Sequence, residues 1–195
     1  MREPITYEKF YLAKGKMRLG HTWFHFKEWD FTIMLPPKCG SSSIKQFIWM
    51  NELEDKVDTI RHYEVRGKVY VVVRNPFDRF VSLWKNKCRD RNPLRKHVRC
   101  IYGMTPEQLM EYIKAGNKDV HWTPQTTLIS QIADVAGVTV DLIPLENLND
   151  WWAEQGYGEL HVFNTSDGTV PMGEELYEDI CRHYAEDFVL YANAL

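Results

Sequence analysis

The hydrophobic positions along the chain follow two periods, one typical of strands and one typical of helices. Residues 69–73 form a continuously apolar, β-branched run, as expected of a central strand covered on both faces. Shorter strand-like segments are predicted at residues 22–26, 31–35 and 138–145. Hydrophobic residues at helical spacing lie between and after these segments, so strands and helices alternate along the chain.

Helix start signals support this alternation. Asn75-Pro76 and Thr105-Pro106 each place a capping residue before a proline at the first helical position. Helices are predicted near residues 44–53, 76–84, 106–113, 146–155 and 172–191. Strands that alternate with helices predict an α/β fold with a largely parallel sheet.

Length and composition favour one soluble globular unit. We expect a single domain spanning residues 1–195, with residues 1–20 as a loosely packed N-terminal extension. Hydrophobic residues make up 44% and charged residues 26% of the chain, as in ordinary soluble proteins. The formal net charge of −3 argues against a general nucleic-acid binder. Residues 85–99 are nevertheless strongly basic, which fits either a solvated face or a surface for an anionic acceptor.

The cysteine pattern and the hydropathy bear on the location of the protein. Its four cysteines show no CxxC spacing, so neither a zinc site nor a dense disulfide framework is predicted. Reduced thiols are the default, although Cys88 and Cys100 could bridge in an oxidising compartment. No stretch reaches the ~18 apolar residues of a membrane span, and the N-terminus lacks an apolar signal region. We therefore expect a cytoplasmic protein, or an anchor-free part of a secretory-pathway enzyme.

A segment rich in glycine and serine, PPKCGSSSIK at residues 36–45, separates a predicted strand from a predicted helix. Ligands of open α/β sheets bind at the carboxyl ends of strands, where this segment lies. Gly40 allows a tight turn, and the amides at positions 41–43 open a helix whose positive dipole end attracts anions. Lys38 and Lys45 supply charge. The segment therefore predicts an anion site; the alternative is a turn whose serines only cap the helix.

The order of lysine and glycine distinguishes this segment from a Walker A loop. That motif, GxxxxGK[ST], places its lysine after the second glycine, whereas here Lys38 precedes Gly40. An ordinary ATP- or GTP-binding loop is thereby disfavoured. The chain also lacks the GxGxxG pattern of dinucleotide-binding folds.

A second segment, RNPFDRFVSLWKNK, begins with Arg74 at the end of the most apolar strand. We expect the Arg74 guanidinium at the same sheet edge as the first segment. Ser82 lies on the following helix, with Arg79 three residues before it on a similar face. A guanidinium fork with a hydroxyl suits a terminal phosphate; alternatively, Arg74 pairs with Asp78 and Ser82 only packs. Together the two segments predict a ligand with phosphates at two separate ends.

These segments resemble motifs of the sulfotransferase superfamily, particularly its carbohydrate-sulfating branch. PPKCGSSSIK is similar to the family's 5′-phosphosulfate loop, and VVVRNPFDRFVSLWKNK to its 3′-phosphate motif. HWTPQ at residues 121–125 and YAEDF at residues 184–188 resemble two later segments. The resemblance runs from about residue 30 to 190. It implies a three-layer α/β/α fold related to P-loop kinases, with a four- or five-stranded, mainly parallel sheet. The chain is shorter than most carbohydrate-modifying members and lacks their usual anchor, which favours a bacterial or viral origin.

The resemblance also implies a reaction and a set of residues. The donor would be 3′-phosphoadenosine 5′-phosphosulfate, the product 3′-phosphoadenosine 5′-phosphate, and the acceptor a hydroxyl, with a carbohydrate favoured. Lys38 would contact the sulfuryl group and the bridging oxygen, and Arg74 and Ser82 the 3′-phosphate. The expected donor site comprises Lys38, Cys39, Gly40, Ser41, Ser42, Ser43, Lys45, Arg74 and Ser82. No carboxylate cluster suggests a metal, and we expect none.

The sequence leaves more than one candidate for the general base and more than one class of function. Histidine is the side chain best tuned to take a proton near neutral pH. His62, upstream of the central strand, and His121, at the start of HWTPQ, are equal candidates, and an Asp or Glu remains open. His62 could instead be an exposed polar residue, and His121 a structural corner. A nucleotide or small-molecule kinase of related fold and a non-catalytic nucleotide-binding module are the competing functions.

Overall fold

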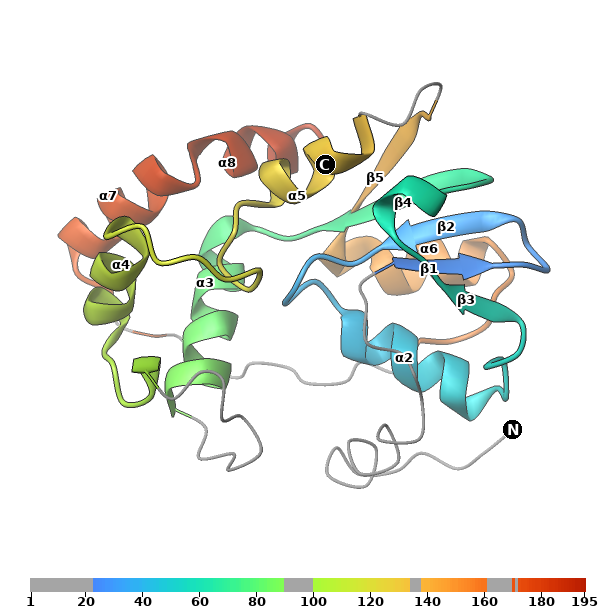
Figure 1. Cartoon of the computed structure of the whole chain (residues 1–195), viewed down its shortest axis with the longest axis horizontal. Coiled ribbons are helices and arrows are strands. Elements are labelled where there is room, and N and C mark those ends of the chain that lie inside the picture. Colours follow the sequence, from blue (N-terminus) through green and yellow to red (C-terminus); the bar gives the residue numbers. More distant parts are fainter. Residues whose placement is uncertain (1–22, 90–99, 134–137, 161–169, 171) are drawn as a thin grey trace.

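A mixed sheet of five strands lies at the centre of the part of the chain that the structure describes. The structure is a computed structural model and describes residues 23–89, 100–133, 138–160, 170 and 172–195. In Figure 1 the sheet lies on the right of the view and a group of helices lies on the left. The expected extension at residues 1–20 and most of the basic run at residues 85–99 lie outside the described residues.

The strand order brings three carboxyl ends to one edge of the sheet. The strands are β1 (Trp23–Phe26), β2 (Phe31–Met34), β3 (Val57–Thr59), β4 (Lys68–Val73) and β5 (Val140–Pro144), in the order β3-β1-β2-β4-β5. β2, β4 and β5 are parallel, whereas β1 is antiparallel to both of its neighbours. Met34 pairs with Val71, and Val73 with Pro144, so the chain leaves all three parallel strands at the same edge. The expected α/β fold is confirmed, with a mixed sheet in which two pairings are parallel and two antiparallel; among the strands, only the short β3 was not predicted.

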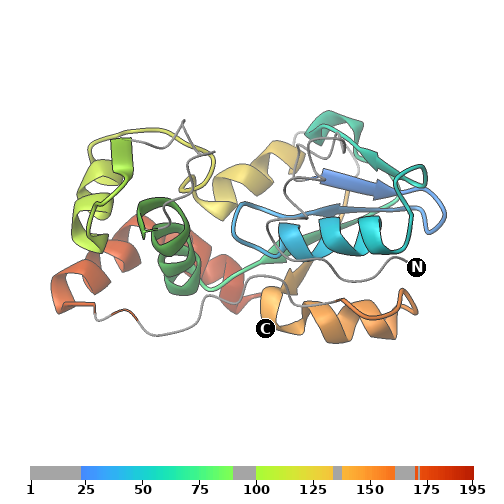
Figure 2. The ribbon, with the colours of Figure 1, turned by 90° about the horizontal axis from the view of Figure 1, so that it is seen from below.

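Helices cover both faces of the sheet, which gives the three-layer α/β/α arrangement expected. On one face lie α2 (Ser41–Met50) and α6 (Leu148–Glu154), side by side in Figure 2, with the rings of Phe47 and Trp152 5.0 Å apart. On the other face lie α5 (Gln125–Ala133) and α8 (Ala185–Ala192), whose apolar side chains share a cluster with Val71 and Val73 of β4. The central strand is therefore buried on both sides, as its continuous apolar run predicts.

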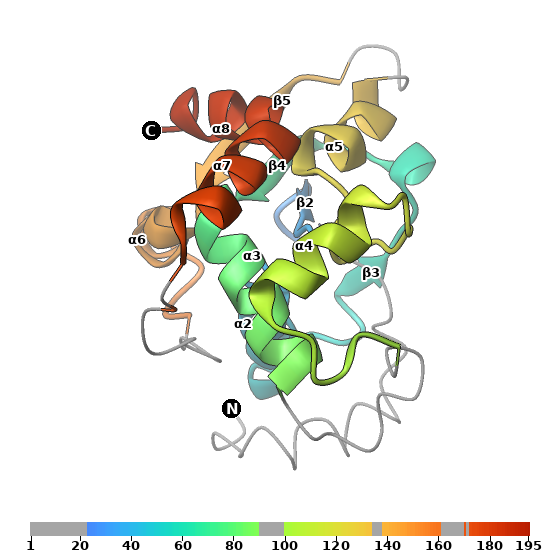
Figure 3. The same ribbon diagram turned by 90° about the vertical axis from the view of Figure 1, so that its left-hand side faces the viewer.

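A group of three helices, with an apolar cluster of its own, lies beyond the edge at which the parallel strands end. It contains α3 (Pro76–Trp84), α4 (Pro106–Lys114) and α7 (Glu174–His183), which lie at the front of the view in Figure 3. Both predicted caps are present: Asn75 accepts a hydrogen bond from the Phe77 amide at 3.0 Å, and Thr105 forms a capping box with Gln108. A π-helix, η2 (Lys85–Arg89), continues α3 into the basic run.

The prediction of one C-terminal helix over residues 172–191 is wrong, because two helices meet there. α7 ends at His183 and α8 begins at Ala185, with Tyr184 between them in a non-helical conformation. The Tyr184 side chain is buried, and its hydroxyl donates a 2.9 Å hydrogen bond to the carbonyl of Trp122. This tertiary contact turns the chain where the apolar spacing alone predicts continuation. The predicted helix at residues 146–155 is α6, preceded by a short 3₁₀ turn at Leu145–Asn147.

The structure also bears on the expectations about disulfides and membrane spans. All four cysteines are free; Cys88 is buried, whereas Cys100 is exposed beside the hydroxyl of Tyr112. None of the helices in the described ranges combines the length and the apolar character that a bilayer crossing requires.

Candidate functional site

The loop between β2 and α2 is a tight turn with two residues in left-handed backbone. Lys38 and Gly40 both have left-handed backbone, with φ of 75° and 80°, and the Cys39 amide donates to the Pro36 carbonyl at 3.0 Å. A Cβ on Gly40 would lie 2.9 Å from Cδ1 of Leu145, which follows β5. Both the left-handed backbone and the close approach to Leu145 therefore favour glycine at position 40.

The start of α2 has no side chain that caps its backbone amides. Gly40 is the N-cap residue, and no side chain caps the helix, so the serines do not serve as its caps. The Ser43 amide donates to the Gly40 carbonyl at 2.9 Å, and the amides at the start of the helix carry its positive dipole end. Ser41 and Ser42 are half-buried and Ser43 is buried. This helix start is therefore suited to hold an anion.

The two lysines of the loop occupy different environments. Lys38 is half-buried within the turn. Lys45 is 7% exposed, and its Nζ lies 5.8 Å from the centre of the buried Phe24 ring in the sheet. The charge of Lys45 is therefore held against the sheet, and its contact with a ligand stays a prediction.

Arg74 lies directly beside this loop, as expected for residues that follow neighbouring parallel strands. Its Nη1 donates a 3.0 Å hydrogen bond to the Lys38 carbonyl. Burial lowers the pKa of the Arg74 guanidinium, while nearby acidic groups, Asp78 and Glu146 among them, act in the opposite direction. A partly desolvated cation of this kind gains from a bound anion. Ser82 is buried on α3, and its role in anion binding stays a prediction.

Arg79 is not an open anion ligand, although it shares the helix with Ser82. Its side chain is 3% exposed, and Nε donates to the Pro37 carbonyl at 3.2 Å. Nη2 donates to the carbonyls of Thr123 at 2.8 Å and His121 at 3.4 Å. Arg79 therefore links the loop after β2 to the segment that precedes α5.

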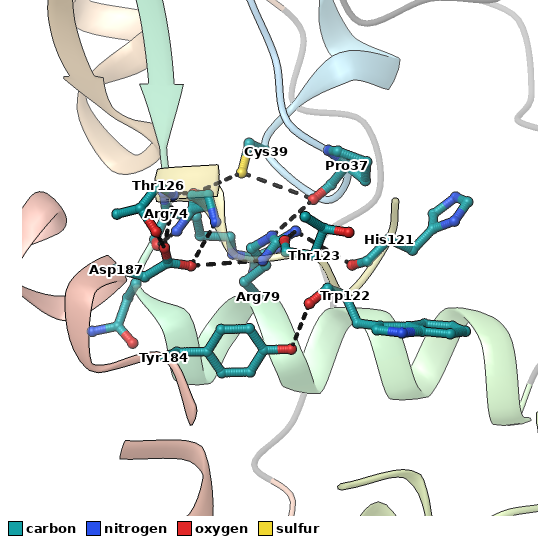
Figure 4. A network of polar contacts seen from close by, with 12 residues as sticks. Pro37, Cys39, Arg74, Arg79, His121, Trp122, Thr123, Thr126, Tyr184 and Asp187 are labelled. Atoms are coloured by element: carbon teal, nitrogen blue, oxygen red, sulfur yellow. Dashed lines mark hydrogen bonds and ion pairs between the residues drawn. The ribbon is translucent and has the colours of Figure 1, made fainter. Parts of the chain in front are cut away.

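The HWTPQ and YAEDF segments meet around this arginine, as Figure 4 shows. Gln125 is fully buried, and its side chain binds both the amide and the carbonyl of Arg74. Asp187 accepts hydrogen bonds from the amides of Gln125 and Thr126 at the start of α5. Sequence reasoning identified both segments by resemblance but not these contacts, because residues 62 positions apart give no local signal of pairing.

His121 carries a carboxylate partner that the sequence did not single out. Oδ1 of Asp119 lies 2.5 Å from Nδ1 of His121 and also accepts the His121 amide at 2.8 Å. Burial and the charge of Lys87 lower the pKa of His121, while Asp119 raises it. Hydrogen bonds from His121 lower the pKa of Asp119, in opposition to burial. The histidine is therefore held in one orientation, with Nε2 as the remaining nitrogen.

The other candidate base, His62, also lies at the ligand edge. It opens the 3₁₀-helix η1 (His62–Glu64), which follows the carboxyl end of β3, and β3 runs in the same direction as β2. Its ring is half-buried and packs edge-on against Tyr63, with centroids 5.2 Å apart. Of the two histidines, only His121 is hydrogen-bonded to a carboxylate within the described part of the chain. The described ranges also contain no group of three or more metal-ligating side chains.

Comparison with known proteins gives one match. The model of the family described as "Sulfotransferase family" matches residues 37–136, just over half of the 195 residues. The matched segment begins in the loop after β2 and includes Lys38, Arg74, Ser82 and His121. Neither a curated protein nor a solved structure matches the chain.

Proposed function

The chain belongs to the sulfotransferase family, and we propose that it moves a sulfuryl group from 3′-phosphoadenosine 5′-phosphosulfate to a hydroxyl acceptor. The observation that carries this proposal is the direct contact between the two anion-binding segments, the Arg74–Lys38 hydrogen bond of 3.0 Å. A nucleotide with phosphates at its 3′ and 5′ ends needs two anion sites at a fixed separation. A simple mononucleotide needs only one.

In this proposal the start of α2 holds the 5′-phosphate. Ser41, Ser42 and Ser43 lie in the first turn of this helix, whose dipole favours negative charge, and their hydroxyls are further donors for the phosphate. Gly40 allows the tight turn that brings the chain from β2 into this helix start. Arg74 and Ser82 hold the 3′-phosphate, and the burial that lowers the pKa of Arg74 favours an incoming anion.

Lys38 serves the transfer itself. Its position supports this role, since Lys38 lies in the turn before α2 and its carbonyl accepts a hydrogen bond from Arg74. Sulfuryl transfer, like phosphoryl transfer, demands in-line geometry and stabilisation of charge on the transferring and leaving oxygens. A mobile ammonium at this point supplies that charge as the bond between sulfur and the bridging oxygen breaks.

His121 is the general base that we propose, in preference to His62. Asp119 binds Nδ1 of His121, so Nε2 is left as the proton acceptor. Burial keeps the pKa of His121 below its ordinary value, so the ring is neutral near physiological pH. Arg79 binds the carbonyls of both Pro37 and His121, which keeps this histidine near the donor loop.

The proposed reaction then balances in one displacement. The acceptor oxygen forms a bond to sulfur while the bond from sulfur to the 5′-phosphate oxygen breaks. His121 takes the proton of the acceptor hydroxyl at Nε2 and later releases it to solvent. The products are a sulfate ester and 3′-phosphoadenosine 5′-phosphate. We propose a carbohydrate as the acceptor, supported by the resemblance of residues 121–125 to the carbohydrate-sulfating branch.

Calorimetric titration with 3′-phosphoadenosine 5′-phosphate and with ATP tests the donor. We expect the bisphosphate to bind at least about tenfold more tightly, since two charged contacts are available to it. Tight ATP binding without a response to the bisphosphate would overturn the proposal in favour of a kinase. Transfer of labelled sulfate to a panel of carbohydrates tests the reaction. Bisphosphate binding without transfer to any hydroxyl, and without donor turnover, would indicate a non-catalytic module.

A further inference from the structure

We infer that Asp187, at the start of α8, acts with Gln125 and Arg79 as a positioning unit that fixes the separation of the two donor-binding segments. This inference rests on the proposed function. None of the three residues needs to touch the donor. All three are buried, with exposed fractions of 0%, 0% and 3% for Asp187, Gln125 and Arg79.

Gln125 joins the two segments to each other. Its Oε1 accepts hydrogen bonds from the Arg74 amide at 2.9 Å and from Sγ of Cys39 at 3.3 Å. Its Nε2 donates to the Arg74 carbonyl at 2.9 Å. Burial raises the pKa of Cys39 to about 11, so the thiol keeps the proton that it donates. One amide group thus contacts the end of β4 and the middle of the phosphate loop.

Asp187 holds Gln125 in place. Oδ2 accepts the Gln125 amide at 2.8 Å, and Oδ1 accepts the amide and the hydroxyl of Thr126 at 2.9 and 3.0 Å. A carboxylate from α8 thus satisfies the first amides of α5, the role that an N-cap side chain of the same helix usually fills. The negative charge also lies at the positive dipole end of α5, where it is favoured.

Arg79 connects Asp187 to the loop that follows β2. Its Nη1 lies 3.9 Å from Oδ2 of Asp187, and its Nε donates to the Pro37 carbonyl. The positive charge of Arg79 offsets the buried negative charge of Asp187, which would otherwise be costly to desolvate. Through Arg79 and Gln125, the single carboxylate of Asp187 therefore reaches both sides of the loop at residues 36–40.

The consequence is specific to a ligand with two anionic ends. Such a ligand gains from both sites only if their separation is preset, as in any bivalent interaction. 5′-AMP occupies one site and is indifferent to that separation. Loss of the positioning unit should therefore reduce the affinity for 3′-phosphoadenosine 5′-phosphate much more than the affinity for 5′-AMP. A purely structural role would leave the ratio of the two affinities unchanged in the folded fraction.

The test compares Asp187→Asn with Asp179→Asn. Asp179 lies on α7 and pairs with Lys114 and Arg182, so its substitution also removes one carboxylate from the C-terminal helices without touching the loops. We expect Asp187→Asn to lower the affinity ratio of bisphosphate to 5′-AMP about tenfold, the loss of one charge-assisted contact. Asp179→Asn should leave the ratio within about twofold of wild type.

Two uncharged variants keep the inference open to refutation if Asp187→Asn does not fold. Gln125→Met removes the hydrogen bonds to Arg74 and Cys39 without adding a charge, and Thr126→Val removes one hydrogen bond to Asp187. Both should lower the ratio in the same direction. An unchanged ratio in both variants, with wild-type bisphosphate binding intact, overturns the inference alone. Failure of the wild-type protein to bind the bisphosphate overturns the proposed function, and the inference with it.

Discussion

Nη1 of Arg74 donates a 3.0 Å hydrogen bond to the carbonyl oxygen of Lys38, so the end of β4 and the loop after β2 are joined directly. The two residues are 36 positions apart in the chain and meet because β2 and β4 are parallel neighbours. The contact orients the guanidinium across the loop. It makes the two predicted anion sites parts of one surface.

Substitution of Arg74 should weaken binding of the 3′-phosphate without affecting binding of the 5′-phosphate. Arg74→Ala is expected to weaken 3′-phosphoadenosine 5′-phosphate about 10- to 100-fold, since hydrogen bonds to charged groups contribute ~1.5–3 kcal/mol. Binding of 5′-AMP should change little, and calorimetry measures both. Arg74→Lys is the matched control, because it keeps the charge but not the fork, and it should give an intermediate loss. Equal losses for the two nucleotides would show that Arg74 does not bind the 3′ end.

Lys38 should affect turnover more than affinity. Lys38→Ala is expected to reduce kcat about 100-fold or more, the usual effect of removing a group that stabilises transition-state charge. Dissociation constants for the bisphosphate should change only a few-fold. Lys38→Gly separates side chain from backbone, because it tolerates the left-handed φ of 75°. Recovery of kcat in Lys38→Gly would mean that the loop conformation, and not the ammonium, is what the reaction requires.

The acidic limb of the pH–rate profile should report His121. Burial and then Lys87 lower the pKa of His121 from its ordinary 6.5, so the neutral, active ring forms on a limb below pH 6.5. Lys87→Met removes a lowering charge, and the limb should move to higher pH. Asp119→Asn removes a raising charge, so the limb should move to lower pH, and kcat should fall about tenfold or more as the ring loses its orientation. His62→Asn serves as the control. A limb that moves with His62→Asn and not with Lys87→Met would reassign the base to His62.

Gly40 should be intolerant of a side chain for two separable reasons. Gly40→Ala is expected to destabilise the fold by about 1–3 kcal/mol for the left-handed backbone, and more because the new Cβ meets Leu145. Gly103→Ala is the matched control: its φ is 85°, but no atom lies within 4 Å of the new Cβ. Chemical denaturation should show a larger loss for position 40. Equal losses would mean that Leu145 moves aside without cost.

Local chemistry predicted the caps and the principal strands well. Asn75 and Thr105 cap their helices as their residue types suggest, and the apolar run at residues 69–73 is the central strand β4. These features depend on side chains close in sequence, or on burial of a whole segment. The same is true of Gly40, whose turn can be inferred from its neighbours alone.

The interior of the site could not be predicted in this way. The sequence predicts that Arg79 and Ser82 lie on the same face of a helix. The Arg79 guanidinium, however, donates its hydrogen bonds to main-chain carbonyls of two other segments. Asp119 shows no pattern that would mark it as the partner of His121. Each of these roles depends on which loops the fold brings together, and neither helical nor strand periodicity contains that information.

The bond between the start of α5 and Asp187 also bears on protein engineering. The family match ends at residue 136, so a fragment trimmed to that match would lose the carboxylate that accepts the Gln125 amide. In chimaeras between relatives, the segment at residues 121–125 and the segment at residues 184–188 should be exchanged together. Exchange of either one alone would put the contacts of Asp187 with Gln125 and Thr126, and of Tyr184 with Trp122, at risk.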